Sequence, residues 1–565
     1  MPYTGGQMLA ASLIEQNVDT LFMIPGVQLD WAVDALRERQ NQIKLVVPRH
    51  EQATTYMADG YYRVSGKPGV AMVVPGPGVL NAGAGLATAY AANSKVVLIA
   101  GNVHSHGIGA GYGLLHEIKD QTGLIAGLTK WNANVDDPAQ IGAAMHAAFA
   151  QLHAGRPRPV GIEVPHDVLE ARAGATPADT TRWRDAATPP PAAPLDMEVV
   201  GRIARAIDEA RLPVLYVGGG VIAANASEAL ARLARKVGMP VVLSDNGLGA
   251  LSDRDPLAMN TLAGRAVFEH ADLVVVVGSR FMNALHPSPS WSAAGTRFIH
   301  INIDADDLRA PRRAAIALQA DAAEALGALA DAVKPREVLT EAEARGLKEW
   351  AQAQIDRVTP QVDYIRAMRS ALPEDGIFVN ELTQVGYLSR IAFPIYTPRS
   401  YVGPGYQGTL GYGFPTALGA AVGGGGRRVL SITGDGGFGW NLQELATARK
   451  YNLPVTLVVF NDGHFGNVRA IQKRVFGPDN QVAVELQNPD FVALAQAFGV
   501  PGVRATSAAA LQAAITDSLS QNGPVLIEAP VGEMPSPWHL MRLQPMPGVK
   551  VPDAGPHPLS SRPPV

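Results

Sequence analysis

The feature that most constrains the fold is a strand–helix–strand pattern in the last third of the chain. A β-branched run at residues 429–433 ends in Gly434-Asp435-Gly436-Gly437, and a second apolar run at 455–460 stops at Asn461-Asp462-Gly463. The residues between the two runs, up to Arg449, are compatible with one helix. Such a unit is typical of an α/β sheet in which the two strands run parallel.

This pattern predicts a site for a metal ion and a diphosphate. In parallel α/β sheets, ligands bind outside the carboxyl ends of the strands. Glycines at Gly436 and Gly437 allow backbone N–H groups to approach a phosphate, and the N-terminus of the following helix favours negative charge. Asp435 and Asp462 add two hard oxygen ligands, which suit Mg²⁺.

Composition limits the classes of protein that fit. The 565 residues are 47% hydrophobic and 17% charged, which is enough core for roughly three to four domains. The net charge of −4 gives no electrostatic basis for binding nucleic acid or an anionic membrane, and the lack of cysteine excludes disulfides and zinc–sulfur sites. No apolar run approaches the ~20 residues of a membrane span, and the N-terminal segment has no cationic region typical of a signal peptide. We therefore expect a soluble, cytoplasmic protein.

Strand and helix patterns alternate along the chain and predict an α/β fold of three consecutive doubly wound domains with mainly parallel sheets. The predicted domains cover residues 1–172, 196–335 and 361–530. The proline-rich segment 173–195 is expected to be a linker without regular structure, and a charged helical stretch, 318–357, supplies a linker helix within 336–360. The tail, 531–565, is either an arm over another surface or disordered.

Two features of the first predicted domain suggest a binding site for a flat ring. Glu51 follows a short strand and leads into an alanine-rich helix, so its carboxyl group is expected to be partly desolvated and suited to proton exchange. After the next strand, Pro75-Gly76-Pro77-Gly78 predicts a tight backbone wall against which a ring can lie.

Four motifs, in the same order along the chain, carry a family resemblance. Arg49-His50-Glu51 matches an RHE motif, and Gly76-Pro77-Gly78 with Asn81 matches GPGxxN. Residues 408–415 match GTxGxGxP, and Gly434-Asp435-Gly436 with Asn461-Asp462 matches GDG followed by a pair of asparagines. The chain resembles, over nearly its whole length, the thiamine-diphosphate-dependent enzymes of the acetolactate synthase, pyruvate oxidase and benzoylformate decarboxylase group.

The resemblance implies pyrimidine-binding, central and diphosphate-binding domains, in this order. It implies that Glu51 hydrogen-bonds the aminopyrimidine ring of thiamine diphosphate and so promotes loss of the thiazolium C2 proton. Leu410 is expected to support the bent cofactor between its two rings. The other expected cofactor contacts are Gly76, Pro77, Asn81, Gln384, Gly408, Gly434, Asp435, Gly436, Gly437 and Asp462.

The metal site departs from the family pattern. The second asparagine of the family falls on Asp462, so Mg²⁺ is expected to bind Asp435, Asp462 and the backbone carbonyl of His464. Aspartate remains a sound oxygen donor, but it adds one negative charge beside the diphosphate. Asn461 is the alternative ligand if this register is wrong.

Candidate substrate residues follow other strand ends. Gln28 lies where relatives place a residue that faces the reacting carbon, and His116 lies where acetolactate synthases have a glutamine, so both are predicted to be catalytic. A histidine there can pass protons to a substrate carboxylate or carbonyl oxygen. Asn467 and Ile471 lie on the segment that lines the substrate pocket in relatives. The predicted substrate is a 2-oxo acid or a 2-hydroxy carbonyl compound.

Four further residues match the family pattern loosely. Glu381 and Thr383, like Gln384, follow a strand after which relatives place groups against the diphosphate; a solvent-facing loop is the alternative. His104 and His106 are either catalytic residues or surface loop residues.

Several activities remain open. The leading prediction is C–C bond cleavage, with or without carboligation, by an acetolactate synthase-like 2-oxo acid decarboxylase or carboligase. One alternative is a 2-hydroxyacyl-CoA lyase or oxalyl-CoA decarboxylase, in which Arg309, Arg312 and Arg313 would bind the CoA phosphates. Others are a benzaldehyde lyase-like lyase of 2-hydroxy ketones and a catalytically silent paralogue that binds the cofactor.

FAD binding is doubtful, because residues 259–264 replace the loop that usually contacts it. Leu115-His116 and Ile471 also replace residues of the acetolactate synthase pocket. Glu51 and Asp435 lie in different domains, which meet across subunits in relatives. We therefore expect a homodimer or homotetramer with active sites at the subunit interface.

Overall fold

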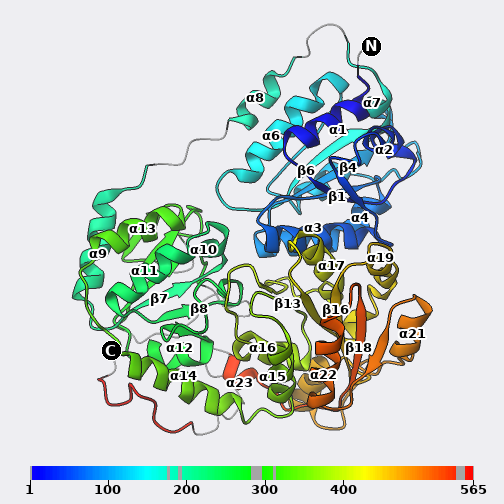
Figure 1. Cartoon of the computed structure of the whole chain (residues 1–565). Helices are drawn as coiled ribbons and strands as arrows, with labels where there is room; N and C mark the ends of the chain where they lie inside the picture. Colours follow the sequence, from blue (N-terminus) through cyan, green and yellow to red (C-terminus); the bar gives the residue numbers. More distant parts are fainter. Residues whose placement is uncertain are drawn as a thin grey trace.

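The structure, a computed structural model, describes residues 3–174, 179–188, 194–281, 295–309, 313–541 and 554–563. Strands and helices alternate along these ranges and build three six-stranded sheets, each packed between helices (Figure 1). All paired strands within the sheets run parallel. The predicted fold of three α/β domains is confirmed.

The N-terminal sheet has the strand order β2-β1-β3-β4-β6-β5. Its strands are β1 (Thr20–Met23), β2 (Lys44–Val46), β3 (Gly69–Val73), β4 (Val96–Asn102), β5 (Trp131–Asn134) and β6 (Val160–Pro165). Its helices are α1 (Gly5–Glu15), α2 (Asp30–Arg37), α3 (Glu51–Ser65), α4 (Pro77–Ala92), α5 (Gln121–Ala126), α6 (Ile141–His153) and α7 (His166–Glu170). The order reverses direction between β1 and β3, which is where ligands bind in open α/β sheets.

The central sheet has the order β12-β11-β10-β7-β8-β9. Its strands are β7 (Pro213–Val217), β8 (Val241–Leu243), β9 (Ala258–Met259), β10 (Leu273–Val277), β11 (Arg297–Asn302) and β12 (Ile316–Gln319). The helices around it are α9 (Met197–Glu209), α10 (Gly219–Ala223), α11 (Ser227–Val237), α12 (Thr261–Phe268) and α13 (Ala322–Ala332). β7 and β10 are buried along their whole length, which explains their unbroken apolar sequences.

The C-terminal sheet has the order β14-β13-β15-β16-β18-β17, which repeats that of the N-terminal sheet when strands are counted from the first. Its strands are β13 (Ile377–Asn380), β14 (Tyr401–Val402), β15 (Val429–Gly434), β16 (Val455–Asn461), β17 (Gly502–Arg504) and β18 (Val525–Pro530). The helices of this part are α14 (Glu341–Ile355), α15 (Gln361–Ala371), α16 (Gln384–Ala392), α17 (Gly413–Gly423), α18 (Asp435–Phe438), α19 (Leu445–Lys450), α20 (Gly466–Phe476), α21 (Phe491–Ala497), α22 (Ala508–Leu519) and α23 (Trp538–Met541).

The single helix predicted after Gly437 is wrong. The chain forms the short helix α18, a 3-10 turn at Leu442–Glu444 and then α19. The break falls at Asn441, whose side-chain amide donates a hydrogen bond to the carbonyl oxygen of Gly411. This tertiary contact turns the chain, so that Glu444 points toward the N-terminal domain.

Two further expectations are corrected by packing. The segment 173–195 contains a helix, α8 (Thr181–Ala187), because its proline-free part buries Trp183 and joins that indole to the side chain of Gln140. The charged stretch 318–357 is not helical throughout. It begins in β12, which pairs with β11, and is interrupted between α13 and α14 by residues 333–340, which include Pro335.

Helices α3 and α17 join the N-terminal and C-terminal domains along a close contact (Figure 1). A Cβ atom at Gly60 of α3 would lie 2.1 Å from the carbonyl oxygen of Thr416, and one at Gly419 of α17 would lie 2.0 Å from that of Met57. The two backbones approach this closely only because both positions lack a side chain. The contact brings the start of α3 beside the glycine loops of the C-terminal domain.

The described part of the tail packs against the rest of the chain. Leu540 of α23 and Leu559 are buried in the same core cluster as the central sheet. Arg542, within the tail expected at residues 531–565, lies outside the described residues. None of the described helices is long and apolar enough to span a membrane.

Candidate active site

The predicted site residues follow the carboxyl ends of neighbouring strands. Gln28 comes after β1 and the turn at Gly76 after β3, and these two strands are paired. Asp435 follows β15 and Asp462 follows β16, which are also paired. Parallel strands end at the same edge of a sheet, so each pair of residues lies together.

Glu51 is the first residue of α3 and contacts a second predicted residue. Its Oε2 atom accepts a hydrogen bond of 2.9 Å from the side-chain amide of Asn81, near the start of α4. The side chain of Glu51 is 19% exposed, and Nδ1 of His50 lies 4.0 Å from the same Oε2 atom. The RHE and GPGxxN motifs thus meet at one carboxyl group.

The C-terminal domain holds the backbone around Glu51. The carboxylate of Glu444 accepts hydrogen bonds from the backbone N–H groups of Arg49 and His50, at 3.0 to 3.1 Å. Gln52 donates from its side chain to the carbonyl oxygen of Trp440 and to Oδ1 of Asn441. Glu444 is fully buried, and burial raises the pKa of its carboxyl group. We did not predict Glu444 from the sequence, because no local signal separates it from other helical glutamates.

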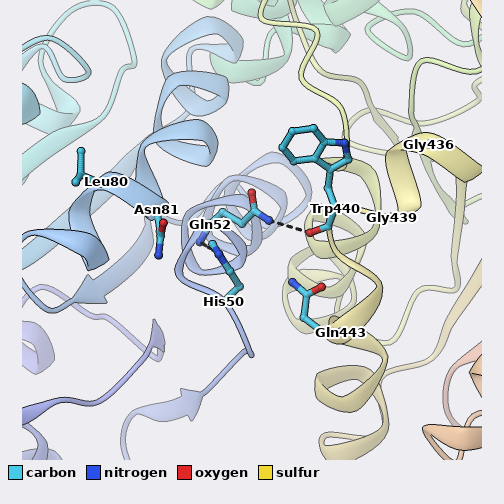
Figure 2. Close-up of a pocket in the computed structure, with 8 residues that line it drawn as sticks. All are labelled: His50, Gln52, Leu80, Asn81, Gly436, Gly439, Trp440 and Gln443. Carbon is cyan, nitrogen blue, oxygen red and sulfur yellow. Dashed lines mark hydrogen bonds between the residues drawn. The ribbon is translucent and has the colours of Figure 1, made fainter. Parts of the chain in front are cut away.

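These contacts border an open cleft of about 650 Å³ between the N-terminal and C-terminal domains (Figure 2). Leu80 and Trp440 are more than half exposed there, at 54% and 56%. The cleft is lined by His50, Gln52, Leu80, Asn81, Gly436, Gly439, Trp440 and Gln443. Three of the four sequence motifs therefore contribute to one cleft.

The turn at Gly76 is held in place by a buried network of hydrogen bonds. Gly76 has φ +58°, and a Cβ atom there would lie 2.2 Å from the carbonyl oxygen of His116. The backbone N–H of Gly76 donates to Oε1 of Gln121, whose amide nitrogen donates to the carbonyl oxygen of Gly101 and to Oε2 of Glu163. Gln121 and Glu163 were not predicted, since their role depends on pairing with residues far away in the sequence.

The structure brings together the two residues predicted to be catalytic on the substrate side. The amide nitrogen of Gln28 donates a 3.1 Å hydrogen bond to the carbonyl oxygen of Leu115, the residue before His116. His116 has φ +70°, an uncommon backbone conformation for a residue with a side chain. Oε1 of Gln28 and Nδ1 of His116 are buried atoms without a hydrogen-bond partner among the described residues. Two orphaned polar atoms on adjoining segments fit a polar ligand.

The looser histidine candidates interact with each other. Nδ1 of His104 lies 2.7 Å from Nδ1 of His106 and 3.3 Å from the carboxylate of Asp167. Of the residues expected near the substrate, Asn467 accepts a hydrogen bond from the indole of Trp538, and Ile471 is 39% exposed.

The two predicted metal-binding carboxylates lie close together. Oδ2 of Asp435 accepts hydrogen bonds from the backbone N–H of Gly463 and the amide of Asn488, at 2.9 and 2.6 Å. Asp462 accepts from the side chain of Gln384 and from the backbone N–H of His464, at 2.6 and 3.1 Å. Burial raises the pKa of both carboxyl groups, and the neighbouring charge of Asp462 also raises the pKa of Asp435. A divalent cation would relieve this repulsion, so the donor set fits Mg²⁺.

Asn461, the alternative metal ligand, is engaged elsewhere. Its Oδ1 atom accepts hydrogen bonds from Asn488 and Gly463, and its amide nitrogen donates to Glu528 at 2.9 Å. Nδ1 of the His464 ring is hydrogen-bonded to the carbonyl oxygen of Asp462. The expected metal ligand of His464 therefore remains its backbone carbonyl oxygen, not its ring.

Glu381 contacts the glycine loop at residues 408–413. Its buried carboxylate accepts hydrogen bonds from the backbone N–H groups of Gly411 and Gly413, at 2.8 and 3.0 Å. Burial raises its pKa to about 7. Glu381 is therefore not in a solvent-facing loop but supports the loop at residues 408–413. Thr383 caps α16 by accepting a hydrogen bond from Gly386.

This supported loop presents Leu410 outward. Gly408 and Gly411, on either side of it, have φ values of +60° and +81°. Leu410 is 38% exposed, although a leucine in such a structured loop would normally be buried. Its exposure distinguishes it from an ordinary core leucine and is consistent with a surface that supports a ligand.

Glycines also shape the predicted diphosphate loop. A Cβ atom at Gly437 would lie 2.1 Å from Oε1 of Glu381, and one at Gly436 would lie 2.8 Å from the ring of Phe465. Neither position has room for a side chain. The lack of side chains at these positions lets Glu381 and Phe465 pack directly against the backbone at the start of α18.

The central domain contains the residues considered for other ligands. Arg309 is 75% exposed at its side chain and pairs with Asp306 at 3.4 Å, whereas Arg312 lies outside the described residues. In the segment that replaces the FAD-contacting loop, Asn260 caps α12 and donates to the carbonyl oxygen of Ile391.

Comparison with known proteins identifies all three domains. Residues 3–124, 200–329 and 384–529 match the N-terminal TPP binding domain, the central domain and the C-terminal TPP binding domain of thiamine pyrophosphate enzymes. The chain is 33% identical over 538 residues to a probable 2-ketoarginine decarboxylase, AruI, of Pseudomonas aeruginosa. The matched region covers 93% of each chain.

Acetolactate synthases are similarly related. The chain is 32% identical to a probable acetolactate synthase large subunit of Methanocaldococcus jannaschii, over 93% of this chain and 91% of that one. It is 29% identical to the large subunit of acetolactate synthase isozyme 3 of Escherichia coli, over 92% of each chain. The motifs, the three domains and these relatives agree, and the chain belongs to the thiamine-diphosphate-dependent enzymes, among the acetolactate synthase-like members of that family.

Proposed function

We propose that this enzyme cleaves the bond between the carboxyl and carbonyl carbons of a 2-oxo acid, with or without transfer of the remaining fragment to a carbonyl acceptor. The contact of Glu51 with Asn81 at the cleft, beside the loop of Asp435, is the observation that carries the proposal. Asn81, which donates to Glu51, and Gly436, next to Asp435, line this cleft together, and this supports the assignment of Glu51 as the acid–base group. The relatives named as acetolactate synthases and as a 2-ketoarginine decarboxylase support the same class of substrate.

The residues present fit thiamine diphosphate and Mg²⁺. Glu51 would hold a proton at the pyrimidine ring, Leu410 would support the thiazolium ring, and Gly436 and Gly437 would donate backbone N–H groups to the diphosphate. When bound, the cofactor would supply a nucleophilic carbon for the substrate carbonyl and an electron sink for the pair left behind when CO₂ departs. Asp435, Asp462 and the carbonyl oxygen of His464 would bind the metal ion.

On the substrate side, Gln28 and His116 would orient the reacting group. Their unpaired buried atoms, Oε1 and Nδ1, adjoin the turn at Gly76, against which the pyrimidine ring is expected to lie. An imidazole can donate a proton to the substrate oxygen or accept one from it. His116 is therefore the candidate that distinguishes this site from acetolactate synthases, which have a glutamine there.

We also propose that a second copy of the chain covers the cleft. Helix α20, which follows the metal loop, has no buried residue, and its apolar side chains Val468, Ile471, Val475 and Phe476 are 39% to 65% exposed. Leu115, on the substrate loop of the N-terminal domain, is 62% exposed. Exposed apolar groups on both sides of a site are typical of a surface that associates. A homodimer, or a homotetramer built from two, buries them and excludes water from the reaction.

A substrate screen tests the proposed reaction. The purified chain, with thiamine diphosphate and Mg²⁺, is incubated with pyruvate, 2-ketoarginine, benzoylformate, 2-hydroxy ketones and oxalyl-CoA, and both CO₂ and carbonyl products are measured. We expect CO₂ from a 2-oxo acid and a loss of about 100-fold or more in kcat for Glu51→Gln, the range for removal of a general acid–base group. The exposed Glu38→Gln is the matched control.

Three results would contradict the proposal. Turnover of oxalyl-CoA alone would favour the CoA-dependent alternative, and cleavage of 2-hydroxy ketones without CO₂ would favour the lyase. Cofactor binding without exchange of the thiazolium C2 proton would make the chain a silent paralogue.

A further inference from the structure

A cluster of metal-ligating side chains lies outside the cleft, where the C-terminal segment packs on the central domain. Glu269 and His270 follow the end of α12, and His557 belongs to the C-terminal segment 554–563. One possible ligand atom from each of the three side chains lies within 4.8 Å of the others. Neither the family motifs nor the proposed reaction uses these residues.

The separations suit a small divalent cation. Nε2 of His557 lies 3.4 Å from Oε2 of Glu269. Two ligands that bind Zn²⁺ tetrahedrally at about 2.0 to 2.1 Å are about 3.3 to 3.4 Å from each other. The two side chains therefore need little movement to share an ion.

Burial and neighbouring contacts hold the histidines in place. His270 is 7% exposed and the ring of His557 is 10% exposed, whereas the side chain of Glu269 is 59% exposed and opens the cluster to solvent. Nδ1 of His270 lies 3.4 Å from the carbonyl oxygen of Pro563. In a neutral ring, Nδ1 carries the proton for this contact, so Nε2 has a free lone pair for a metal ion. Many metal-binding histidines have this arrangement, with one ring nitrogen on the metal and the other donating to a carbonyl group.

The segment that carries His557 is anchored on both sides. Before it, the indole of Trp350 donates to the carbonyl oxygen of Gly555. After it, Leu559 is fully buried and Arg562 forms an ion pair of 2.5 Å with Glu343. His557 is thus presented to Glu269 by a fixed backbone, so little conformational entropy is lost when an ion binds.

Without a metal, the same atoms form a hydrogen bond. The backbone N–H of Leu559 lies 3.3 Å from Nδ1 of His557, so the proton of the neutral ring is on Nε2 and faces Glu269. A cation takes the place of this proton, and the long contact with Leu559 is given up. Arg265, one turn earlier in α12, donates to the carbonyl oxygen of His539 and adds a positive charge near Glu269. The loss of the Leu559 contact and the positive charge of Arg265 both lower the affinity of the cluster for a cation.

We propose that Glu269, His270 and His557 bind a transition-metal cation of the Zn²⁺ or Ni²⁺ type, which fastens the C-terminal segment to the central domain. Two imidazoles and one carboxylate favour these ions over Mg²⁺, which prefers oxygen ligands throughout. Three protein ligands leave a coordination position for water on the exposed side of Glu269. The role is structural and is separate from the Mg²⁺ expected at Asp435.

Calorimetric titration of the full chain tests this site. The chain is treated with a chelator, loaded with thiamine diphosphate and excess Mg²⁺, and titrated with Zn²⁺. We expect one Zn²⁺ site per chain, which His557→Ala and His270→Ala weaken by about 100-fold or more and Glu269→Gln weakens by about 10-fold. His104→Ala is the control, because His104 and His106 form the other close pair of imidazoles in the described chain. That variant should bind Zn²⁺ as the natural chain does.

Limited proteolysis gives a second measurement that does not depend on affinity. Zn²⁺ should slow cleavage within the C-terminal segment of the natural chain and of His104→Ala, but not of His557→Ala. Zn²⁺ binding that survives in His557→Ala, or that disappears in His104→Ala, would overturn the proposal. No Zn²⁺ uptake at all would show that Glu269 and His557 form only a hydrogen bond.

Discussion

The chemistry of single residues in this site depends on partners from distant parts of the chain. Glu51 is oriented by Asn81, and the backbone around it is held by Glu444 of the C-terminal domain. Asp435 is buried and Asp462 half-buried, and the charge of Asp462 raises the pKa of Asp435. Two carboxylates so placed are stable together only when a cation or a proton compensates.

We expect the two aspartates to contribute unequally to cofactor binding. Asp435→Ala removes a buried carboxylate that also accepts hydrogen bonds from Gly463 and Asn488, and should abolish binding of thiamine diphosphate with Mg²⁺. Asp462→Asn keeps an oxygen donor and should change the affinity by less than about 10-fold. Fluorescence titration with the cofactor measures both. If the Asp462→Asn chain takes up no cofactor, the register is wrong and Asn461 becomes the better ligand.

At the scale of elements, α3 and α17 act as one unit that connects two domains. Gly60→Ala places a methyl group 2.1 Å from a backbone oxygen, which has no room to move. We expect a loss of about 2 kcal/mol, as for other overpacked cores, and a lower midpoint of thermal unfolding. Gly327→Ala, in α13, is the control: its added Cβ would meet only the end of the Arg232 side chain, at 3.9 Å, so the change should be neutral or stabilising. Equal effects of the two changes would show that the contact between α3 and α17 contributes nothing.

The loop that carries Leu410 should make stability depend on pH through Glu381. The pKa of this buried carboxyl group is raised to about 7 in the folded chain, from an ordinary value of 4.5. A raised pKa means that the folded state holds the proton more tightly, so this stability is present below pH 4.5 and is lost as pH rises to about 7. The slope is at most about 1.4 kcal/mol per pH unit.

Thermal unfolding of the natural chain and of Glu381→Gln, measured from pH 5 to 8, checks this dependence. The midpoint of the natural chain should fall relative to that of Glu381→Gln as pH rises from 5, and the difference should level off above about pH 7. A difference that is independent of pH would show that Glu381 does not titrate in this range.

At the scale of the whole molecule, the first and third sheets have the same strand order, so the chain contains two similar domains. Each carries its predicted site loops at the carboxyl ends of its strands. We propose that a second copy of the chain covers the exposed apolar side chains of α20 and of the loop at Leu115. Within one chain, Asn81 and Gly436 line the same cleft. In a homodimer with the arrangement expected from the family resemblance, each site would instead combine the Glu51 of one chain with the Asp435 of the other.

Mixing two inactive variants tests this arrangement. Co-expressed Glu51→Gln and Asp435→Ala chains should recover up to about a quarter of the natural activity, because half of the dimers are mixed and one of their two sites is intact. Each variant expressed alone should remain inactive. No recovery in isolated mixed dimers would show that each site is built within one chain.

The sequence by itself determined the fold class and predicted most residues of the proposed cofactor site. Buried parallel strands need continuous apolar runs, and close approach to a phosphate needs glycine, so β7, β10 and the loop at Gly434 could be predicted from local chemistry alone. Glu51, Asn81 and Leu410 were found through motifs that keep a fixed spacing. These signals are local, and folding does not change them.

Only the tertiary structure decided which residues hold the site in place. Glu444, Gln121 and Glu163 act through partners up to 395 residues away, and Glu381 is buried and accepts hydrogen bonds from the loop at residues 408–413. The helix break at Asn441, the helix α8 and the placement of His557 beside Glu269 likewise follow from long-range contacts. A sequence shows what a side chain can donate, accept or bury; which partner it meets is determined when the sheets and helices pack.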